Sequence, residues 1–175
     1  QAIQLLAEHE RAGRELVLEV NLSGRSMGDA ELFEVLEHDL RETGIDASKL
    51  VLEITETAAI ENMEEARIFA ERLAALGCRL ALDDFGSGFG SFYYLKHLPF
   101  DYLKIDGDFV RNLLRNPVDQ AVVRSIVQIA DSVGYETIAE FVTDAATLEA
   151  VRGYGVNFAQ GFHVGMPEPI ELLPR

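Results

Sequence analysis

The sequence lacks several features that would assign it to common classes of protein. It contains one cysteine, Cys78, so no disulfide can form within the chain, which fits a reducing cytoplasm. No apolar run approaches the roughly 18 residues that cross a bilayer, and no signal peptide is recognisable. We therefore expect a cytoplasmic domain without direct membrane insertion, within a parent protein that can itself be membrane-tethered.

Basic residues are also scarce, with 15 Lys and Arg against 30 Asp and Glu, which gives a formal net charge of −15. Broad contact with a nucleic-acid backbone needs clustered Lys and Arg, so the composition argues against DNA binding. An anionic ligand can still bind where divalent cations first neutralise the site. Apolar residues make up 48% of the 175, which predicts a folded chain that forms one domain over residues 1–175.

Two hydrophobic periodicities alternate along the chain. Short apolar runs predict strands at 16–22, 50–54, 79–83, 102–106, 136–140 and 156–160. Helical patterns are expected at 1–12, 29–42, 62–76, 92–98 and 145–152, and in a two-part stretch broken at Pro117 that ends near 133. Gly44 and Gly77 should close two of these helices. Alternating strands and helices imply parallel pairing through crossover helices, which is an α/β fold.

Each predicted strand ends in a polar or charged side chain. In a (β/α) barrel such strand ends converge on one face, where the active site lies. Helix capping accounts for one such residue but hardly for a set on six strands, namely Asn21, Glu53, Asp83 with Asp84, Lys104, Glu140 and Gln160.

A complete barrel has eight strands and about 250 residues, whereas this sequence offers six strands. The chain opens inside a helical pattern with Gln1, so we expect the missing strands to precede it. Unpaired backbone groups at the open edges would favour a homodimer or a strand-exchanged oligomer.

The strand-end side chains are chiefly oxygen donors. Without a converging His or Cys they favour Mg²⁺ or Mn²⁺ over zinc. Two adjacent aspartates can serve two cations, and a pair about 3.5–4 Å apart can activate water and stabilise an in-line phosphoryl displacement. Lys104 can hold that water or offset the charge of the phosphate.

Five motifs make a family resemblance recognisable over the whole chain. In residue types, order and spacing, the chain resembles the EAL domain family through Asn21-Leu22-Ser23, Glu53-Ile54-Thr55-Glu56, Asp83-Asp84-Phe85-Gly86-Ser87-Gly88-Phe89, Leu103-Lys104-Ile105-Asp106 and Gln160-Gly161. The resemblance implies a TIM-like barrel with one strand reversed. It also implies phosphodiesterase activity in bacterial signalling, in which cyclic-di-GMP is hydrolysed to linear pGpG with Mg²⁺ or Mn²⁺. Sensory or GGDEF domains are expected upstream in the parent protein.

The resemblance further implies a role for each matching residue. Ligands of a first cation would be Asn21, Glu53 and Asp83, and those of a second would be Asp83, Asp84 and Glu140. Lys104 would contact the attacking water as a catalytic residue together with Glu140, and Gln160 would lie close by. Glu56 would anchor the glycine-rich loop after Asp84, and the substrate would be bound by Ser23, Gly24 and Arg25.

Three departures from the family pattern leave an alternative open. The Glu-Ala-Leu strand is absent because the chain begins after it, Thr143 stands where a second glutamate is usual, and Gly107 replaces a commonly basic residue. The alternative is a catalytically inactive cyclic-di-GMP receptor or interaction module, and a third reading is another Mg²⁺-dependent barrel phosphodiesterase. We expect this chain alone to be weak or inactive and a longer version to be active.

Two local patterns allow other interpretations. Asp84-Phe85-Gly86 also spells the metal-binding triplet of protein kinases, but no glycine-rich nucleotide loop accompanies it. The aromatic cluster Phe89, Phe92, Tyr93 and Tyr94 predicts either helix packing on the barrel or a dimer contact.

Overall fold

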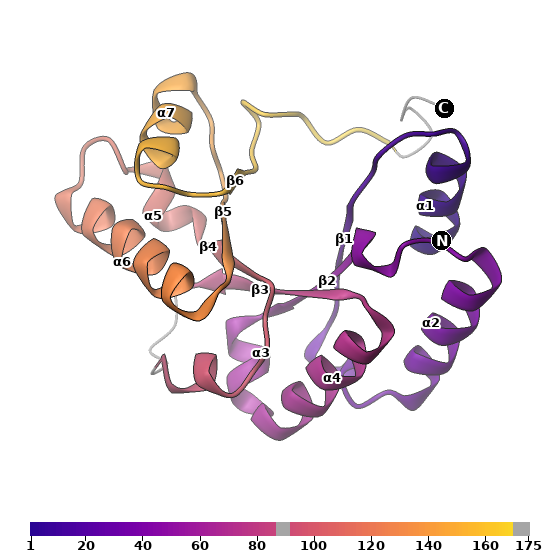
Figure 1. Cartoon of the computed structure of the whole chain (residues 1–175). Helices are drawn as coiled ribbons and strands as arrows, with labels where there is room; N and C mark the ends of the chain where they lie inside the picture. Colours follow the sequence, from indigo (N-terminus) through magenta and orange to yellow (C-terminus); the bar gives the residue numbers. More distant parts are fainter. Residues whose placement is uncertain (87–91, 170–175) are drawn as a thin grey trace. The chain divides into compact units, whose positions relative to one another are not determined.

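The computed structural model of the chain describes residues 1–86 and 92–169 (Figure 1). The described residues divide into two compact units, of which the first holds Gln1–Ala81 and Phe92–Phe100 and the second holds 82–86 and 101–169. Strand β3, Arg79–Phe85, passes from the first unit to the second. Within each unit strands and helices alternate, as the sequence predicts. The described residues contain no helix that is both long and apolar enough to cross a membrane.

The first unit contains two full strands with their helices. Its β1 and β2 run parallel, with Leu18 opposite Leu50 and Asn21 opposite Glu53. Its elements before β3 are α1 (Ala2–Arg11), β1 (Leu18–Asn21), η1 (Gly24–Ser26), α2 (Ala30–Thr43), η2 (Ala47–Lys49), β2 (Leu50–Thr55), α3 (Glu56–Glu61) and α4 (Met63–Leu76). The short helix expected near 92–98 is the 3₁₀ segment η3, Phe92–Lys96.

Caps set the helix ends in this unit. The side chain of Asp29 accepts a hydrogen bond from the Glu31 N–H at 2.9 Å at the start of α2. Gly44 and Gly77 end α2 and α4 with φ of 67° and 82°, as predicted, because glycine adopts this left-handed conformation without steric cost. Helix α3 was not predicted, and the Thr55 hydroxyl that accepts from the Ala58 N–H starts it.

The core of the first unit surrounds β2. The residues Leu50 to Ile54 are all buried, which is typical of a parallel strand covered on both faces. From the helices, the rings of Phe33 and Phe69 meet edge to face with centroids 5.3 Å apart. Cys78 is buried just before β3, and burial raises the pKa of its thiol to about 11. Cys78 therefore has a structural role, because a buried thiol with a raised pKa forms little of the reactive thiolate near neutral pH.

The second unit continues the alternation after the last part of β3. Its strands pair in parallel, with Tyr102 opposite Glu136 and Ile138 opposite Phe158. Its elements are β4 (Tyr102–Ile105), α5 (Gly107–Arg111), α6 (Pro117–Val133), β5 (Glu136–Ala139), α7 (Ala145–Gly153) and β6 (Phe158–Ala159). Pro117 begins α6 after Asn116, whose side chain accepts from the Val118 N–H, and this confirms the predicted break.

Strand β6 is shorter than the predicted 156–160. At its start the Asn157 side chain takes over the contact with β5, because Oδ1 accepts from the Thr137 N–H at 2.8 Å and from its hydroxyl at 2.9 Å. A side-chain hydrogen bond thus replaces the strand ladder at this position. The ladder is left with Phe158 and Ala159.

Candidate metal centre

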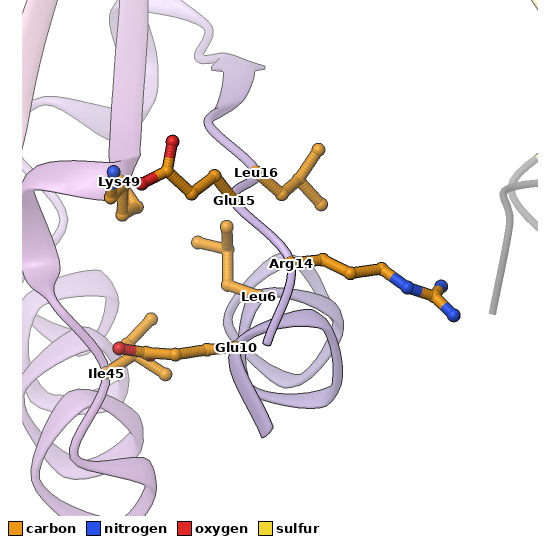
Figure 2. A pocket seen from close by; sticks show the side chains of 7 residues that line it. All are labelled: Leu6, Glu10, Arg14, Glu15, Leu16, Ile45 and Lys49. Atoms are coloured by element: carbon orange, nitrogen blue, oxygen red, sulfur yellow. The ribbon is translucent and has the colours of Figure 1, made fainter. Parts of the chain in front are cut away.

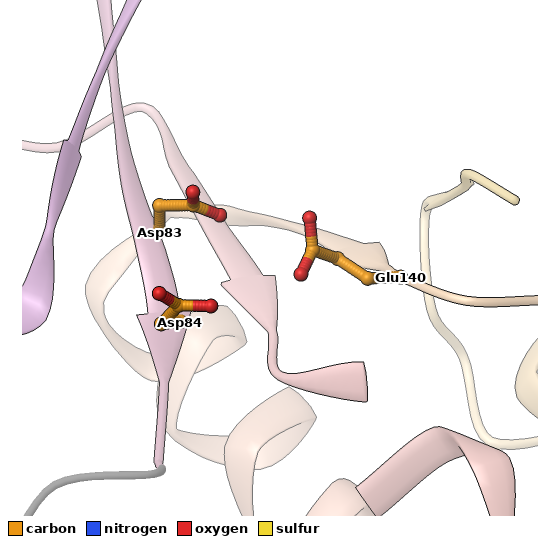
Figure 3. A group of neighbouring side chains, drawn as sticks. All are labelled: Asp83, Asp84 and Glu140. Atoms are coloured by element: carbon orange, nitrogen blue, oxygen red, sulfur yellow. The ribbon is translucent and has the colours of Figure 1, made fainter. Parts of the chain in front are cut away.

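Three carboxylates of the second unit gather in one place. Asp83 and Asp84 come from the end of β3 and Glu140 directly follows β5, and one oxygen of each lies within 4.8 Å of the others (Figure 3). Neighbouring residues of an extended strand point to opposite faces. Asp84 leaves the extended conformation, with φ of 55°, so two successive aspartates can contribute to one group. Aspartate is among the residues that tolerate this conformation best.

Lys104 neutralises part of this acidic cluster. Its Nζ lies 3.0 Å from Asp83 Oδ1 and 3.0 Å from Glu140 Oε1, and the residue is only 3% exposed. Burial is the main cause that raises the pKa of Glu140, and the negative charges of Asp83 and Asp84 add to it. The ammonium of Lys104, 3.0 Å from Glu140 Oε1, opposes that rise.

The donor set fits a divalent cation. Asp83 Oδ1 is buried and receives no well-aligned hydrogen bond from the described residues, although Lys104 Nζ lies 3.0 Å away. A buried carboxylate oxygen left in this state is costly unless another cation satisfies it. Oxygen donors without sulfur or imidazole suit hard cations such as Mg²⁺ and Mn²⁺. The structure therefore brings together Asp83, Asp84, Glu140 and Lys104 from the set predicted from the sequence.

Gln160 lies on a pocket that also includes Glu140. Its N–H donates to the Ala139 carbonyl at 2.8 Å, and its own carbonyl accepts from the Val142 N–H at 3.0 Å. The pocket has an empty volume of about 540 Å³ and is lined by Glu140, Phe141, Thr143, Gln160, Gly161 and Phe162. Thr143, which stands where a second glutamate was expected, thus faces the same pocket.

The remaining predicted site residues lie in the first unit. Asn21 and Glu53 are register partners on β1 and β2, and Glu53 is 3% exposed whereas Asn21 is exposed. The three residues predicted to bind substrate follow β1 and line an open pocket together with Thr55 and Glu61; they are Ser23, Gly24 and Arg25.

Glu56 has a buried partner that the sequence did not reveal. The Tyr94 hydroxyl donates to Glu56 Oε1 at 2.7 Å, and both residues are buried. Burial and this carboxylate raise the pKa of Tyr94 well above its ordinary value. The glycine-rich loop expected to be anchored by Glu56 falls mostly on residues 87–91, outside the described residues, as does Phe89 of the aromatic cluster. Because Tyr94 is buried within the chain, the predicted packing role, rather than a dimer contact, is confirmed for this residue.

The substitution Tyr94→Phe tests this contact. It removes the hydroxyl that Glu56 accepts from, so we expect the free energy of unfolding to fall by about 1–3 kcal/mol. Urea denaturation of both proteins measures the difference. Tyr154→Phe is a suitable control, because Tyr154 is only partly buried and the variant keeps the ring that Arg124 contacts, so it should change stability little. Equal losses for the two variants would contradict the assigned role of the Tyr94 hydroxyl.

A separate pocket lies at the other end of the strands in the first unit (Figure 2). It is lined by Leu16, which precedes β1, and by Lys49, which precedes β2, with Glu10 and Arg14 beside them. Active sites of (β/α) barrels lie at the carboxyl ends of the strands. We therefore assign this pocket no role in catalysis.

Parallel strands with carboxylates at their ends define a (β/α) barrel protein that can bind a divalent cation. The chain matches the family model of the EAL domain over residues 1–167, and it belongs to this family. The barrel fold class and the family predicted from the sequence are thereby confirmed.

The curated relatives carry names that agree with this family. The chain is 42% identical over 153 residues to the cyclic di-GMP phosphodiesterase PdeB of Shewanella oneidensis, which covers 87% of the chain and 18% of the relative. It is 35% identical over 168 residues to the cyclic di-GMP phosphodiesterase PdeF of Escherichia coli, with coverage of 96% and 22%. The chain thus spans about a fifth of the length of these relatives.

Solved structures show the same fold. The PaMucR phosphodiesterase in complex with c-di-GMP superposes with a TM-score of 0.91 at 33% identity, over 99% of this chain and 70% of that one. The EAL domain of FimX from Xanthomonas citri, in complex with c-diGMP, superposes with a TM-score of 0.93 at 29% identity, over 99% and 68%.

Proposed function

We propose that the chain is the larger part of a metal-dependent phosphodiesterase domain that hydrolyses cyclic-di-GMP to linear pGpG. The observation that carries this proposal is the group of Asp83, Asp84 and Glu140 around Lys104, in a family whose curated relatives are named for this activity. A cyclic dinucleotide is anionic, and a chain of net charge −15 needs cations at the site to bind it.

The proposed cation ligands follow the family pattern. Asp83, Asp84 and Glu140 would hold one Mg²⁺ or Mn²⁺, and Asn21 and Glu53 would serve another together with Asp83. Bound cations would activate a water and stabilise the oxygens of the transferred phosphoryl group. Ser23, Gly24 and Arg25 would bind the substrate, and Arg25 is suited to a phosphate because its guanidinium is always charged.

Lys104 and Gln160 supply the remaining proposed contacts. The Lys104 ammonium lies beside two of the carboxylates, and from there it would orient the attacking water and offset phosphate charge. Gln160 lines the same pocket as Glu140, so its amide would hydrogen-bond a group held at that carboxylate. Glu56 would anchor the loop after β3 by means of its hydrogen bond with Tyr94, which lies in η3.

Product release from two chains tests the function. The 175-residue chain and a version extended by about 80 residues at the amino terminus, enough to complete a barrel, would each receive cyclic-di-GMP with Mg²⁺. We expect pGpG from the extended chain, weak or no release from the shorter one, and none from either with a chelator. An extended chain that binds cyclic-di-GMP without cleaving it would contradict the proposed phosphodiesterase activity and favour the inactive receptor.

We also propose that the chain forms a homodimer or a strand-exchanged oligomer in the cytoplasm, downstream of sensory or GGDEF domains in the parent protein. Strand β6 is last in the strand order, so its outer side can pair with a further strand, and Phe158 is half exposed there. Light scattering of the chain should show a dimer, and a monomer at high concentration would contradict the oligomer.

A further inference from the structure

Unfavourable backbone conformations adjoin the carboxylate cluster. Among the described residues, Asp84 and Phe141 are the non-glycine residues with positive φ, at 55° and 52°. Asp84 belongs to the cluster and Phe141 directly follows Glu140. Aspartate adopts such angles comparatively readily, but an aromatic residue is sterically disfavoured there. Such a conformation persists only where surrounding contacts impose it, and these sites are often functional.

Two residues of α5 hold the Phe141 ring. The ring lies against Gly107 so closely that a Cβ at position 107 would be 2.0 Å from Cδ2 of Phe141, nearer than atoms can approach. The Arg111 guanidinium lies over the ring, 4.0 Å from its centroid, where it is attracted by the π-electrons. Phe141 is 48% exposed, so burial in the core is not what fixes its position. We call Gly107, Phe141 and Arg111 the ring clamp.

The backbone on both sides of Phe141 is anchored. The Glu140 N–H donates to the Ile105 carbonyl at 3.3 Å, and the Val142 N–H donates to the Gln160 carbonyl at 3.0 Å. Val142 is fully buried, so it cannot shift without cost. With both neighbours fixed, the positive φ at Phe141 is the conformation that joins the two anchored peptides, so a change at Phe141 would displace the backbone of Glu140.

We propose that the ring clamp positions the Glu140 carboxylate for cation binding, and that it does so only because residue 107 has no side chain. Because Gly107 has no side chain, the Phe141 ring can lie over it. The contacts of the ring with Gly107 and Arg111 then hold the positive φ at Phe141. Glu140 then reaches Lys104 Nζ at 3.0 Å and joins Asp83 and Asp84. Phe141 is a positioning residue in this proposal, which rests on the proposed function for the existence of the cation site.

Mn²⁺ binding to the 175-residue chain tests the clamp. Gly107→Ala should weaken Mn²⁺ binding about 10-fold, because loss of support for a metal ligand typically costs 10–100-fold. The added methyl group displaces the ring, whereas alanine by itself favours helix α5. The double variant Gly107→Ala with Phe141→Gly should bind Mn²⁺ nearly as well as the wild type, since glycine adopts positive φ without a ring to hold it.

The rescue distinguishes positioning from a general loss of structure. Titration calorimetry gives the affinity, Mn²⁺ electron paramagnetic resonance reports the coordination, and thermal melting shows whether each variant is folded. Wild-type affinity in Gly107→Ala would overturn the proposal, and so would a double variant as weak as the single one. If the wild-type chain binds no Mn²⁺, the inference fails, whereas the proposed function is decided separately by pGpG release from the extended chain.

Arg111→Met gives a second test that leaves the backbone of Gly107 and Phe141 unchanged. It removes the guanidinium over the ring and an exposed ion pair with Asp108, which contributes little to stability. We expect Mn²⁺ binding to weaken several-fold at an unchanged melting temperature. Unchanged Mn²⁺ affinity in this variant would overturn the role of the clamp even if Gly107→Ala did not fold.

Discussion

Lys104→Met is expected to lower the free energy of unfolding of the cation-free chain by about 3–5 kcal/mol, the usual cost of leaving a buried charge without its partner. The Lys104 ammonium lies 3.0 Å from a carboxylate oxygen of both Asp83 and Glu140. Methionine has a similar length and no charge, so the variant changes the electrostatics more than the packing. Chemical denaturation in the presence of a chelator measures the loss.

Mn²⁺ should restore part of this stability. A cation bound to the native state at 100 times its Kd contributes about 2.7 kcal/mol. In Lys104→Met the carboxylates no longer have the ammonium as an internal competitor, so Mn²⁺ should stabilise the variant more than the wild type. Lys96→Met, at an exposed position of η3, is the matched control and should change neither quantity. A Lys104→Met chain as stable as wild type without cations would show that the carboxylates do not need this counter-ion.

Asp83→Asn is expected to weaken Mn²⁺ binding by more than about 100-fold, because loss of outer residues around metal ligands already costs 10–100-fold. Asp83 provides a buried oxygen that lacks a well-aligned hydrogen bond from the described residues, and it belongs to both proposed cation sites. The amide keeps the shape of the side chain but removes its negative charge. Release of pGpG by the extended chain should disappear together with Mn²⁺ binding.

The control for this variant is Asp131→Asn, which makes the same chemical change at an exposed position of α6. It should bind Mn²⁺ and release pGpG as the wild type does. Calorimetric titration with Mn²⁺ and chromatography of the product compare the variants directly. Retention of tight Mn²⁺ binding in Asp83→Asn would contradict the assignment of Asp83 as a ligand.

Most of the fold could be predicted from the sequence because its elements carry local signals. Glycines at 44 and 77 end helices as expected, and Pro117 begins α6. Helix α3 was missed because six residues are too few to show a helical period. Strand β6 was predicted to begin too early, because the apolar pattern starts at Val156, before the position where the Asn157 side chain replaces the ladder.

The residues of the carboxylate cluster could be predicted from the sequence, but the contacts and backbone conformations around them could not. Strand ends identified Asp83, Asp84, Lys104 and Glu140, because polar residues after apolar runs are visible in any sequence. The contact between Glu56 and Tyr94 joins residues 38 positions apart, and no local pattern specifies it. A positive φ at a phenylalanine is equally hidden from the sequence, because residue type argues against it.

The shortness of β6 has a consequence for hydrogen exchange in the native state. Two ladder positions, the Asn157 side chain and the Gln160 N–H hold this strand to β5, and Phe158 contributes half-exposed surface. Local opening of such a segment needs less free energy than global unfolding. Amides around Gln160 should therefore exchange before those of β4, so the segment beside Glu140 can open while β4, which carries Lys104, stays closed.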